Sequence, residues 1–235
     1  MKTLLFLALM CAHAAFAQEL RVLSGGAAKA FIDPLAASFT AHKVKVEYLP
    51  MGPLTKALAA GDPADLAVVT SEVVESQKLA GGVPIARVGV GVAVHEKAPS
   101  PDISTPEALK QALLAAKSVV YIDPKIGTSG KHVAEILRRL NISEEVNRKA
   151  TLGTGGYVVA PVGKGEIELG IHQISEIIPV PGVKLVGPLP PALQKYTVYV
   201  AVPRKDSAAL KAFIAHLTGP QAKDRLAQAG YTTPQ

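Results

Sequence analysis

Short apolar segments rich in Val alternate along the chain with longer segments rich in Ala and Leu. In the first third, expected strands at residues 20–23, 44–49 and 65–70 are each followed by an expected helix. This alternation is typical of a sheet with parallel strands and helices packed on both faces. The sequence therefore predicts an α/β fold with mostly parallel sheets, in which ligands bind at the carboxyl ends of the strands.

A second round of the same pattern begins after a Pro-rich boundary. Residues 86–97 alternate Gly and Val, residues 98–101 interrupt them, and Thr105 is expected to cap a helix that begins at Pro106. The final strand and its two helices have no partner of their own, so the chain is expected to return to the first lobe. The prediction is two lobes, residues 18–96 with 197–235 and residues 97–196, joined by a hinge of two strands.

The first 17 residues have the organisation of a secretory signal peptide. Lys2 provides a positive start, an apolar run follows, and residues 15–17 read Ala-Phe-Ala, with small residues where signal peptidase acts. A buried N-terminal helix is the alternative. We expect cleavage after Ala17 and export to the periplasm. Lipidation at Cys11 is not expected, because Met10 stands where a lipidation motif needs a small residue.

Composition excludes several classes of function. The single Cys lies in the expected signal peptide, so the mature chain would have no disulfide, thiolate metal ligand or Cys nucleophile. The six His residues do not form metal-binding pairs in the sequence, so no metal site is expected. The formal net charge of +6 comes from scattered Lys and Arg. Nucleic-acid binding needs a clustered patch, so a modest attraction for anions is the better interpretation.

Gly-containing turns after the expected strands are candidate ligand loops, because free backbone N–H groups at a helix start can approach an anion. Residues 24–27 form one such turn. Residues 127–132 (Gly-Thr-Ser-Gly-Lys-His) are the most suggestive, with two hydroxyls ahead of a helix. Their spacing is not that of a phosphate-binding P-loop. The simpler roles are helix capping for Ser129 and a hydrogen-bonded structural imidazole for His132.

A nucleophilic Ser with His and Asp is a competing class. Ser129 and His132 lie three residues apart, and His172 and Asp123 are available. However, the chain has no Gly-x-Ser-x-Gly elbow. The carboxylates are also dispersed along the sequence, so no pair of them suggests a mechanism with paired carboxylates. We therefore expect no catalysis.

Taken together, these segments resemble the type II periplasmic solute-binding proteins, and within them the molybdate-binding proteins of ABC importers. The segments that carry the resemblance are residues 20–27, 59–66, 123–124 with 127–130, 163–171 and 217–231. They cover essentially the whole mature chain. The resemblance implies a two-lobed monomer without a cofactor, which closes on a small anion and presents it to an ABC permease in the inner membrane.

The resemblance also suggests where the ligand lies. Molybdate binders hold the oxyanion with two Ser side chains, backbone amides and a Tyr. These positions fall here at Ala27, at or beside Gly52, at Ser129, at about Gly155, and at Gln173 for the Tyr. Both first-lobe hydroxyls and the phenol are missing. A buried anion needs several donors, and small residues in place of Ser widen the cleft. The expected ligand is therefore either a molybdate-like oxyanion or an organic carboxylate.

The predicted binding site combines loops of both lobes where strands end. Its members are Gly25, Gly26, Ala27, Met51, Gly52, Thr128, Ser129, Gly130, His132, Gly155, Gly156 and Gln173. Two alternatives stay open. One is a periplasmic enzyme on the same fold, which turnover of the ligand would reveal. The other is a ligand-loaded partner of a sensor or chemoreceptor.

Overall fold

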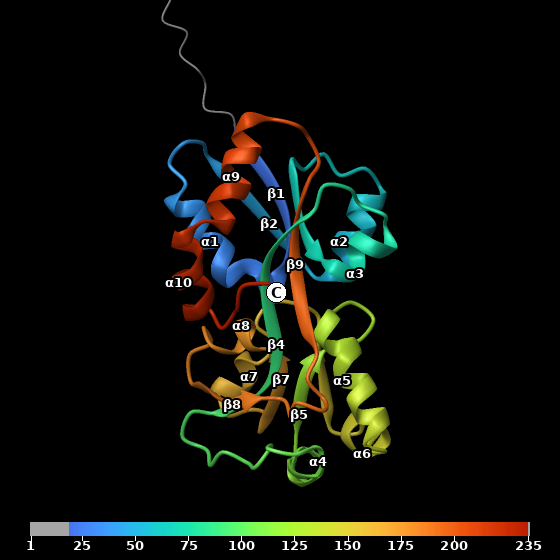
Figure 1. Cartoon of the computed structure of the whole chain (residues 1–235). Coiled ribbons are helices and arrows are strands. Elements are labelled where there is room, and N and C mark those ends of the chain that lie inside the picture. Colours follow the sequence, from blue (N-terminus) through green and yellow to red (C-terminus); the bar gives the residue numbers. More distant parts are fainter. Residues whose placement is uncertain (1–18, 235) are drawn as a thin grey trace, which may run out of the picture.

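The computed structural model describes residues 19–234 as two α/β lobes, one above the other (Figure 1). The expected signal peptide and its cleavage after Ala17 lie outside the described residues. Within residues 19–234, no helix is both long enough and apolar enough to span a membrane.

The first lobe, at the top of Figure 1, begins with three parallel strands in the order β2, β1, β3. Burial of all five residues of β3 explains its continuous apolar sequence. The strands are β1 (Leu20–Gly25), β2 (Val44–Leu49) and β3 (Leu66–Thr70), and the helices after them are a short 3-10 turn η1 (Gly26–Ala28) with α1 (Lys29–Ser38), α2 (Met51–Ala59) and α3 (Ser71–Ser76). The three predicted strands are confirmed.

The second lobe repeats this plan with parallel strands in the order β7, β5, β6. Thr105 caps α4 as expected, because its hydroxyl accepts a hydrogen bond from the Ala108 N–H at 3.1 Å. The strands are β5 (Val119–Ile122), β6 (Ala150–Gly153), β7 (Leu169–Gln173) and β8 (Val183–Pro188), and the helices are α4 (Pro106–Ala115), α5 (Thr128–Arg139), α6 (Ser143–Asn147), α7 (Ala160–Gly163) and α8 (Ile174–Ile177).

Two long strands, β4 (Val83–His95) and β9 (Tyr196–Pro203), join the lobes. Residues 83–89 of β4 pair with β9, and residues 90–94 pair with β7 in the second lobe. Every antiparallel strand pair in residues 19–234 involves β4 or β9, because these strands carry the chain between the lobes in opposite directions. The sheets are therefore parallel within each βα unit and antiparallel at the two-strand hinge.

The side chain of Gln194 ties the two crossings together. Its amide oxygen accepts a hydrogen bond from the Val90 N–H at 2.9 Å, and its amide nitrogen donates to the Val90 carbonyl at 2.8 Å. Gln194 therefore pairs with the β4 backbone much as a neighbouring strand would, just before β9 begins. Lobe boundaries at residues 96/97 and 196/197 remain our proposal.

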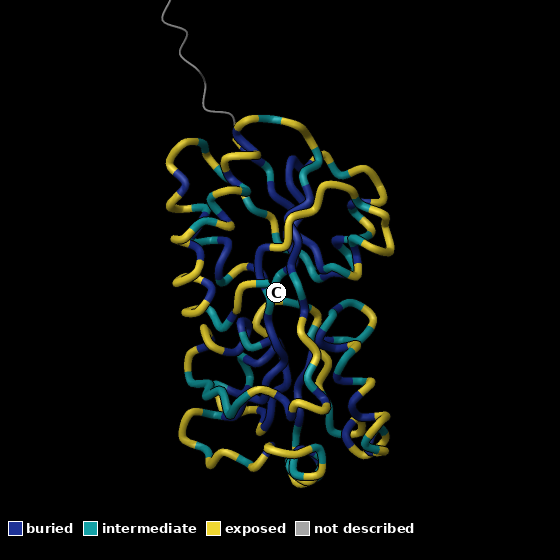
Figure 2. Tube along the Cα trace, in the orientation of Figure 1, coloured by how far each residue is buried: buried dark blue, intermediate teal, exposed yellow. Residues whose placement is uncertain are grey.

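The hydrophobic core is divided in the same way as the lobes. One cluster draws on residues 20–88 and 199–231, and two smaller clusters draw on residues 90–193. Buried segments follow the strands, and exposed ones follow the outer faces of the helices (Figure 2). The last helices, α9 (Ala208–Thr218) and α10 (Pro220–Gln228), pack on α1, so the chain ends on the first lobe as expected.

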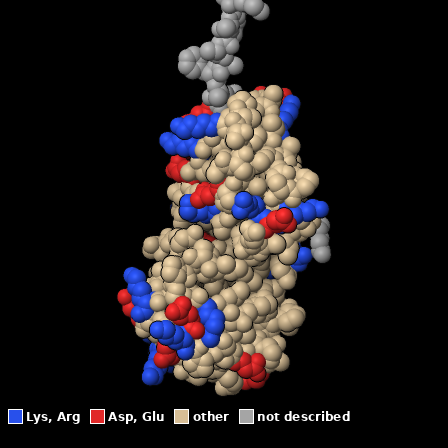
Figure 3. Space-filling model, turned by 90° about the vertical axis from the view of Figure 1, so that its left-hand side faces the viewer, with Lys and Arg blue, Asp and Glu red and all other residues tan. Residues whose placement is uncertain are grey.

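Charged residues of both signs share the surface. On the face displayed in Figure 3, Lys and Arg lie among Asp and Glu on both lobes. Within residues 19–234, ten ion pairs join Lys or Arg to carboxylates, among them Lys43–Glu19 and Arg148–Glu144. The mixing agrees with the scattered charge pattern of the sequence.

Candidate functional site

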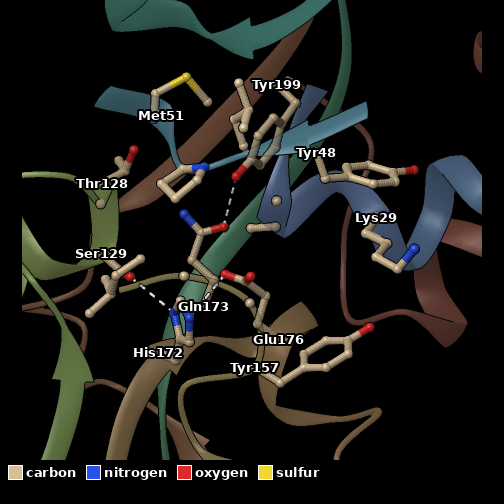
Figure 4. Close-up of a pocket in the computed structure, with 18 residues that line it drawn as sticks. Lys29, Tyr48, Met51, Thr128, Ser129, Tyr157, His172, Gln173, Glu176 and Tyr199 are labelled. Carbon is tan, nitrogen blue, oxygen red and sulfur yellow. Dashed lines mark hydrogen bonds and ion pairs between the residues drawn. The ribbon is translucent and has the colours of Figure 1, made fainter. Parts of the chain in front are cut away.

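A cavity of about 260 Å³ lies between the lobes, where β1, β5 and β7 end. Figure 4 shows the side chains that surround it. The first lobe contributes Gly26, Ala27, Lys29, Tyr48, Leu49, Pro50, Met51 and Tyr199, and the second contributes Ile122, Gly127, Thr128, Ser129, Gly155, Gly156, Tyr157, His172, Gln173 and Glu176. A cavity at the carboxyl ends of strands is the usual position for a ligand in such folds.

Most of the predicted site residues meet at this cavity. The eight that line it are Gly26, Ala27, Met51, Thr128, Ser129, Gly155, Gly156 and Gln173. The other four, Gly25, Gly52, Gly130 and His132, do not line it. Their roles in ligand binding remain predictions, but the structure gives each of these four a different set of contacts.

Gly25, Gly52 and Gly130 are positions of close packing. A Cβ on Gly130 would lie 2.1 Å from the Ile122 carbonyl oxygen, so glycine lets α5 start directly beside the end of β5. A Cβ on Gly25 would lie 2.5 Å from the methyl carbon of Met51. The Gly52 N–H donates to the Ile126 carbonyl of the other lobe at 3.0 Å, so that amide is already used.

His132 does not line the cavity, and its ring bonds to the segment before β9. Its Nε2 lies 2.7 Å from the Leu193 carbonyl oxygen, which can only accept a hydrogen bond. Burial lowers the pKa of His132, so the ring is neutral near pH 7 and donates through Nε2. This hydrogen bond agrees with the structural interpretation of the imidazole, and its role in ligand binding stays a prediction.

Ser129 stands in the first turn of α5, and its side chain does not cap the helix. Gly127 is the N-cap residue, and no side chain of the described residues caps α5. Instead, Ser129 Oγ lies 3.0 Å from His172 Nδ1 in a buried hydrogen bond. The capping interpretation of Ser129 is therefore wrong. The start of α5 brings unpaired backbone N–H groups and the positive end of the helix dipole to the cavity wall.

His172 and Glu176 form a buried pair beside Ser129. His172 Nε2 lies 3.1 Å from Glu176 Oε2, but within the described residues this nitrogen has no well-aligned hydrogen bond. Burial lowers the pKa of His172 to about 4, against a backbone hydrogen bond with Gly156 that raises it. Burial also raises the pKa of Glu176 to about 8. At neutral pH the pair is therefore a protonated acid beside a neutral imidazole.

Gln173 is held from the first-lobe side by β9. The Tyr199 hydroxyl donates to Gln173 Oε1 at 3.0 Å, and Gln173 Nε2 donates to Thr197 Oγ1 at 3.2 Å. The carbonyl oxygen is thus engaged, and one amide hydrogen is left for a ligand. The position to which the resemblance assigns a Tyr therefore carries an amide that a different Tyr orients.

Several side chains of the cavity were not among the predicted site residues. Lys29, Tyr48, Tyr157, His172, Glu176 and Tyr199 all line it. His172 and Glu176 could have been found, since one precedes Gln173 on the same strand and the other follows one helical turn later. Tyr48 and Tyr199 could not, because only the tertiary structure brings β2 and β9 to the cavity.

The lobes contact each other around the cavity. Ser175 Oγ donates to the Ala27 carbonyl at 3.0 Å, and on another side the Gly52 N–H reaches Ile126. Lys195 Nζ forms an ion pair with Glu72 of the first lobe at 2.7 Å. These contacts describe a closed arrangement. In residues 19–234, no three His, Cys, Asp or Glu side chains gather where they could hold a metal ion.

Known proteins place this architecture in a family. The model of a family described as bacterial extracellular solute-binding protein matches residues 20–232. The aconitate isomerase of a Pseudomonas species is 34% identical over 195 residues, which cover 77% of this chain and 73% of that protein.

Solved structures agree on the fold. The periplasmic molybdate-binding protein of Azotobacter vinelandii superposes with a TM-score of 0.74 at 19% identity, covering 92% of this chain and 100% of that one. The sulfate-binding protein SubI of Mycobacterium tuberculosis gives 0.68 at 18% identity, covering 92% and 87%. Both likenesses confirm the expected fold of periplasmic binding proteins, and the chain belongs to the family of bacterial extracellular solute-binding proteins.

Proposed function

We propose that the protein binds a small organic carboxylate between its lobes and presents it to an ABC permease. The observation that carries this proposal is the cavity itself. The start of α5 and the Ser129 hydroxyl form a polar side, and most of the remaining lining is apolar. A carboxylate can accept hydrogen bonds at the polar side, while its carbon skeleton contacts Tyr48, Met51 and Tyr157.

A molybdate-like oxyanion fits this cavity less well. A desolvated tetrahedral dianion needs donors on all sides. Ala27 and Gly52 carry no hydroxyl, the Gly52 N–H is bonded to Ile126, and Gln173 keeps one free amide hydrogen. The side chains of Leu49, Pro50 and Met51 offer no donor to an oxygen that faces them. A ligand with a carbon skeleton contacts the same side chains favourably.

We also propose that the mature protein acts outside the cytoplasm. Removal of residues 1–17 would leave a protein that starts at Gln18, acts as a monomer in the periplasm and delivers its ligand to an inner-membrane permease. Intact-mass analysis of the exported protein tests the first step. A lipid on Cys11, or retention of the first 17 residues, would contradict it.

A thermal-shift screen tests the ligand class. The panel contains molybdate, sulfate and phosphate beside mono-, di- and tricarboxylates. A ligand present at about 100 times its dissociation constant adds about 2.7 kcal/mol of stability, which raises the melting midpoint measurably. Stabilisation by carboxylates, reduced in Ser129→Ala and kept in Thr105→Ala, supports the proposal. Stabilisation by molybdate alone would reject it.

A second candidate function is isomerisation of an unsaturated carboxylic acid. Two observations favour it, namely the 34% identity to an aconitate isomerase and the buried contact of His172 with Glu176 at the cavity. Moving a double bond along a carbon chain requires a base that removes a proton from one carbon and an acid that returns a proton to another. No atom is gained or lost, and no cofactor is required. A neutral imidazole and a protonated carboxyl are such a base and acid.

Proton NMR in D2O separates the two functions. The protein is incubated with cis- or trans-aconitate, and both interconversion and deuterium uptake are followed. An isomerase converts one isomer into the other and labels the carbon, and His172→Gln and Glu176→Gln abolish both. Binding of aconitate without conversion over hours would leave the solute-binding function and exclude the enzyme.

A further inference from the structure

We propose that Lys29 binds a second carboxylate of the ligand, so that the protein selects di- and tricarboxylates over monocarboxylates. This inference rests on the proposed binding of an organic carboxylate, and names its class.

Lys29 supplies the positive charge of the cavity. Among the described residues that line it, Lys29 is the one Lys or Arg, and burial keeps His172 and Glu176 uncharged near neutral pH. The other attractions for an anion are dipoles and hydrogen-bond donors. An anion that places one negative group near this ammonium gains an attraction that no other lining side chain offers.

The charge and the start of α5 lie on opposite sides of the cavity. Figure 4 shows Thr128 and Ser129 on one side and Lys29 on the other, with Gln173 and Glu176 between them. A carboxylate bound at the start of α5 cannot also contact Lys29, because the carbon chain of the ligand fills the space between these two sides. A ligand with carboxylates at two ends can satisfy both.

Lys29 is held in place by an exposed ion pair that it can exchange for another partner. Its Nζ donates to Asp33 Oδ2 at 2.6 Å and lies 4.7 Å from the centre of the Tyr48 ring. The Tyr48 hydroxyl donates to Asp33 Oδ1 at 2.6 Å, which fixes the carboxylate. The Lys29 side chain is 46% exposed, and an ion pair this open is weak and easily exchanged. The flexible stem can therefore turn Nζ toward a ligand carboxylate.

Asp33 acts as the competitor in this arrangement. In the empty cavity it neutralises Lys29, so a monocarboxylate bound at α5 gains little from the ammonium. A second carboxylate on the ligand takes the place of Asp33 as the partner of Lys29. Substitution of Asp33 by Asn should then strengthen binding of dicarboxylates, because it removes a competing negative charge without removing the hydrogen-bond acceptor for Tyr48.

The test compares Lys29→Gln with Lys223→Gln, which removes one positive charge from the exposed face of α10. Dissociation constants are measured by calorimetry for succinate, propane-1,2,3-tricarboxylate and butyrate, with weak ligands measured by competition. We expect Lys29→Gln to lose about tenfold or more for the two polycarboxylates and under threefold for butyrate. Lys223→Gln should match the wild type, and Asp33→Asn should bind succinate more tightly.

The failures are distinguishable. Equal affinities of wild type and Lys29→Gln for succinate, or an equal loss for butyrate and succinate, would overturn the role of Lys29 while organic-anion binding stands. Absence of binding of all three carboxylates to the wild type would overturn the proposed function and this inference with it. Melting of the unliganded variants checks that Lys29→Gln folds normally.

Discussion

Ser129 Oγ lies 3.0 Å from His172 Nδ1, a hydrogen bond that joins the start of α5 to the end of β7. Both residues line the interlobe cavity, and both are buried. The hydroxyl is thus held at a fixed point of the cavity wall by a ring whose other nitrogen faces Glu176. The relationship makes Ser129 a binding residue in our account and not a helix cap.

Ser129→Ala should therefore weaken binding more than folding. Loss of a hydrogen bond to a charged ligand costs roughly 1.5 to 3 kcal/mol, or about ten- to a hundredfold in affinity. The matched control is Thr105→Ala, which removes a true helix cap and should cost about 1 kcal/mol of unfolding free energy with affinity unchanged. Calorimetry and urea unfolding measure the two effects. The reverse pattern, stability lost and affinity kept in Ser129→Ala, would return this serine to a structural role.

Glu176 should make stability fall as the pH rises above neutral. Its pKa is raised from 4.5 to about 8 by burial, so the native state keeps a proton that the unfolded chain has released. The pKa of His172 is lowered from 6.5 to about 4, which has the opposite effect on stability, because the unfolded chain binds a proton that the native state lacks. The two contributions oppose each other between pH 4.5 and 6.5. From pH 6.5 to 8 only Glu176 of the two acts, so the free energy of unfolding falls as the pH rises.

Urea unfolding across this pH range checks the prediction. Wild type should lose stability between pH 6.5 and 8, and Glu176→Gln should lose much less, since the amide does not titrate. The exposed Glu166→Gln serves as the control and should follow the wild type. If all three proteins show the same pH dependence, Glu176 is ionised in the folded state and our assignment of a neutral acid is incorrect.

Serine at position 52 should weaken ligand binding rather than restore an oxyanion site. A Cβ on Gly52 would lie 3.3 Å from both the Cα and the carbonyl oxygen of Ile126 in the other lobe. The added atoms therefore press against the backbone of the other lobe. We expect several-fold weaker binding of every ligand, measured by calorimetry. Ala27→Ser, whose hydroxyl would point to the cavity wall, is the comparison. Tighter molybdate binding by Gly52→Ser would contradict this interpretation.

Gln194→Leu should destabilise the hinge. The Val90 N–H would lose its partner, whereas the Val90 carbonyl would keep the hydrogen bond from the Leu189 N–H at 3.0 Å. An unsatisfied buried donor costs about 1 to 3 kcal/mol. Gln111→Leu on the exposed face of α4 gives the control, with a change near zero. An equal effect of both variants on urea unfolding would show that the hydrogen bonds between Gln194 and Val90 contribute nothing specific to stability.

Local sequence patterns predicted much of the fold. The five buried residues of β3 and the Thr105 cap of α4 are signals that one segment carries by itself, and both are confirmed. The antiparallel hinge pairing of β4 with β9 is not visible locally, because residues more than 100 positions apart form it. The unpartnered final strand and its two helices predicted the return to the first lobe, but not which strands pair there.

The same distinction applies to the site. Loops at strand ends pointed to Ala27 and Ser129, and the resemblance added Gln173. All three line the same cavity, since parallel strands bring these ends together. The partner of Ser129 lies 43 residues away, and the Tyr199 that orients Gln173 comes from the returning strand. Burial of Glu176, which makes its carboxyl neutral, depends on packing that the sequence does not display.

Calorimetric titration of the wild type with propane-1,2,3-tricarboxylate and with molybdate decides whether the ligand is an organic carboxylate or an oxyanion. We predict saturable binding of the tricarboxylate, weakened about tenfold or more in Ser129→Ala, and far weaker binding of molybdate. Tight binding of molybdate that Ser129→Ala leaves unchanged, together with no binding of the tricarboxylate, would contradict this prediction.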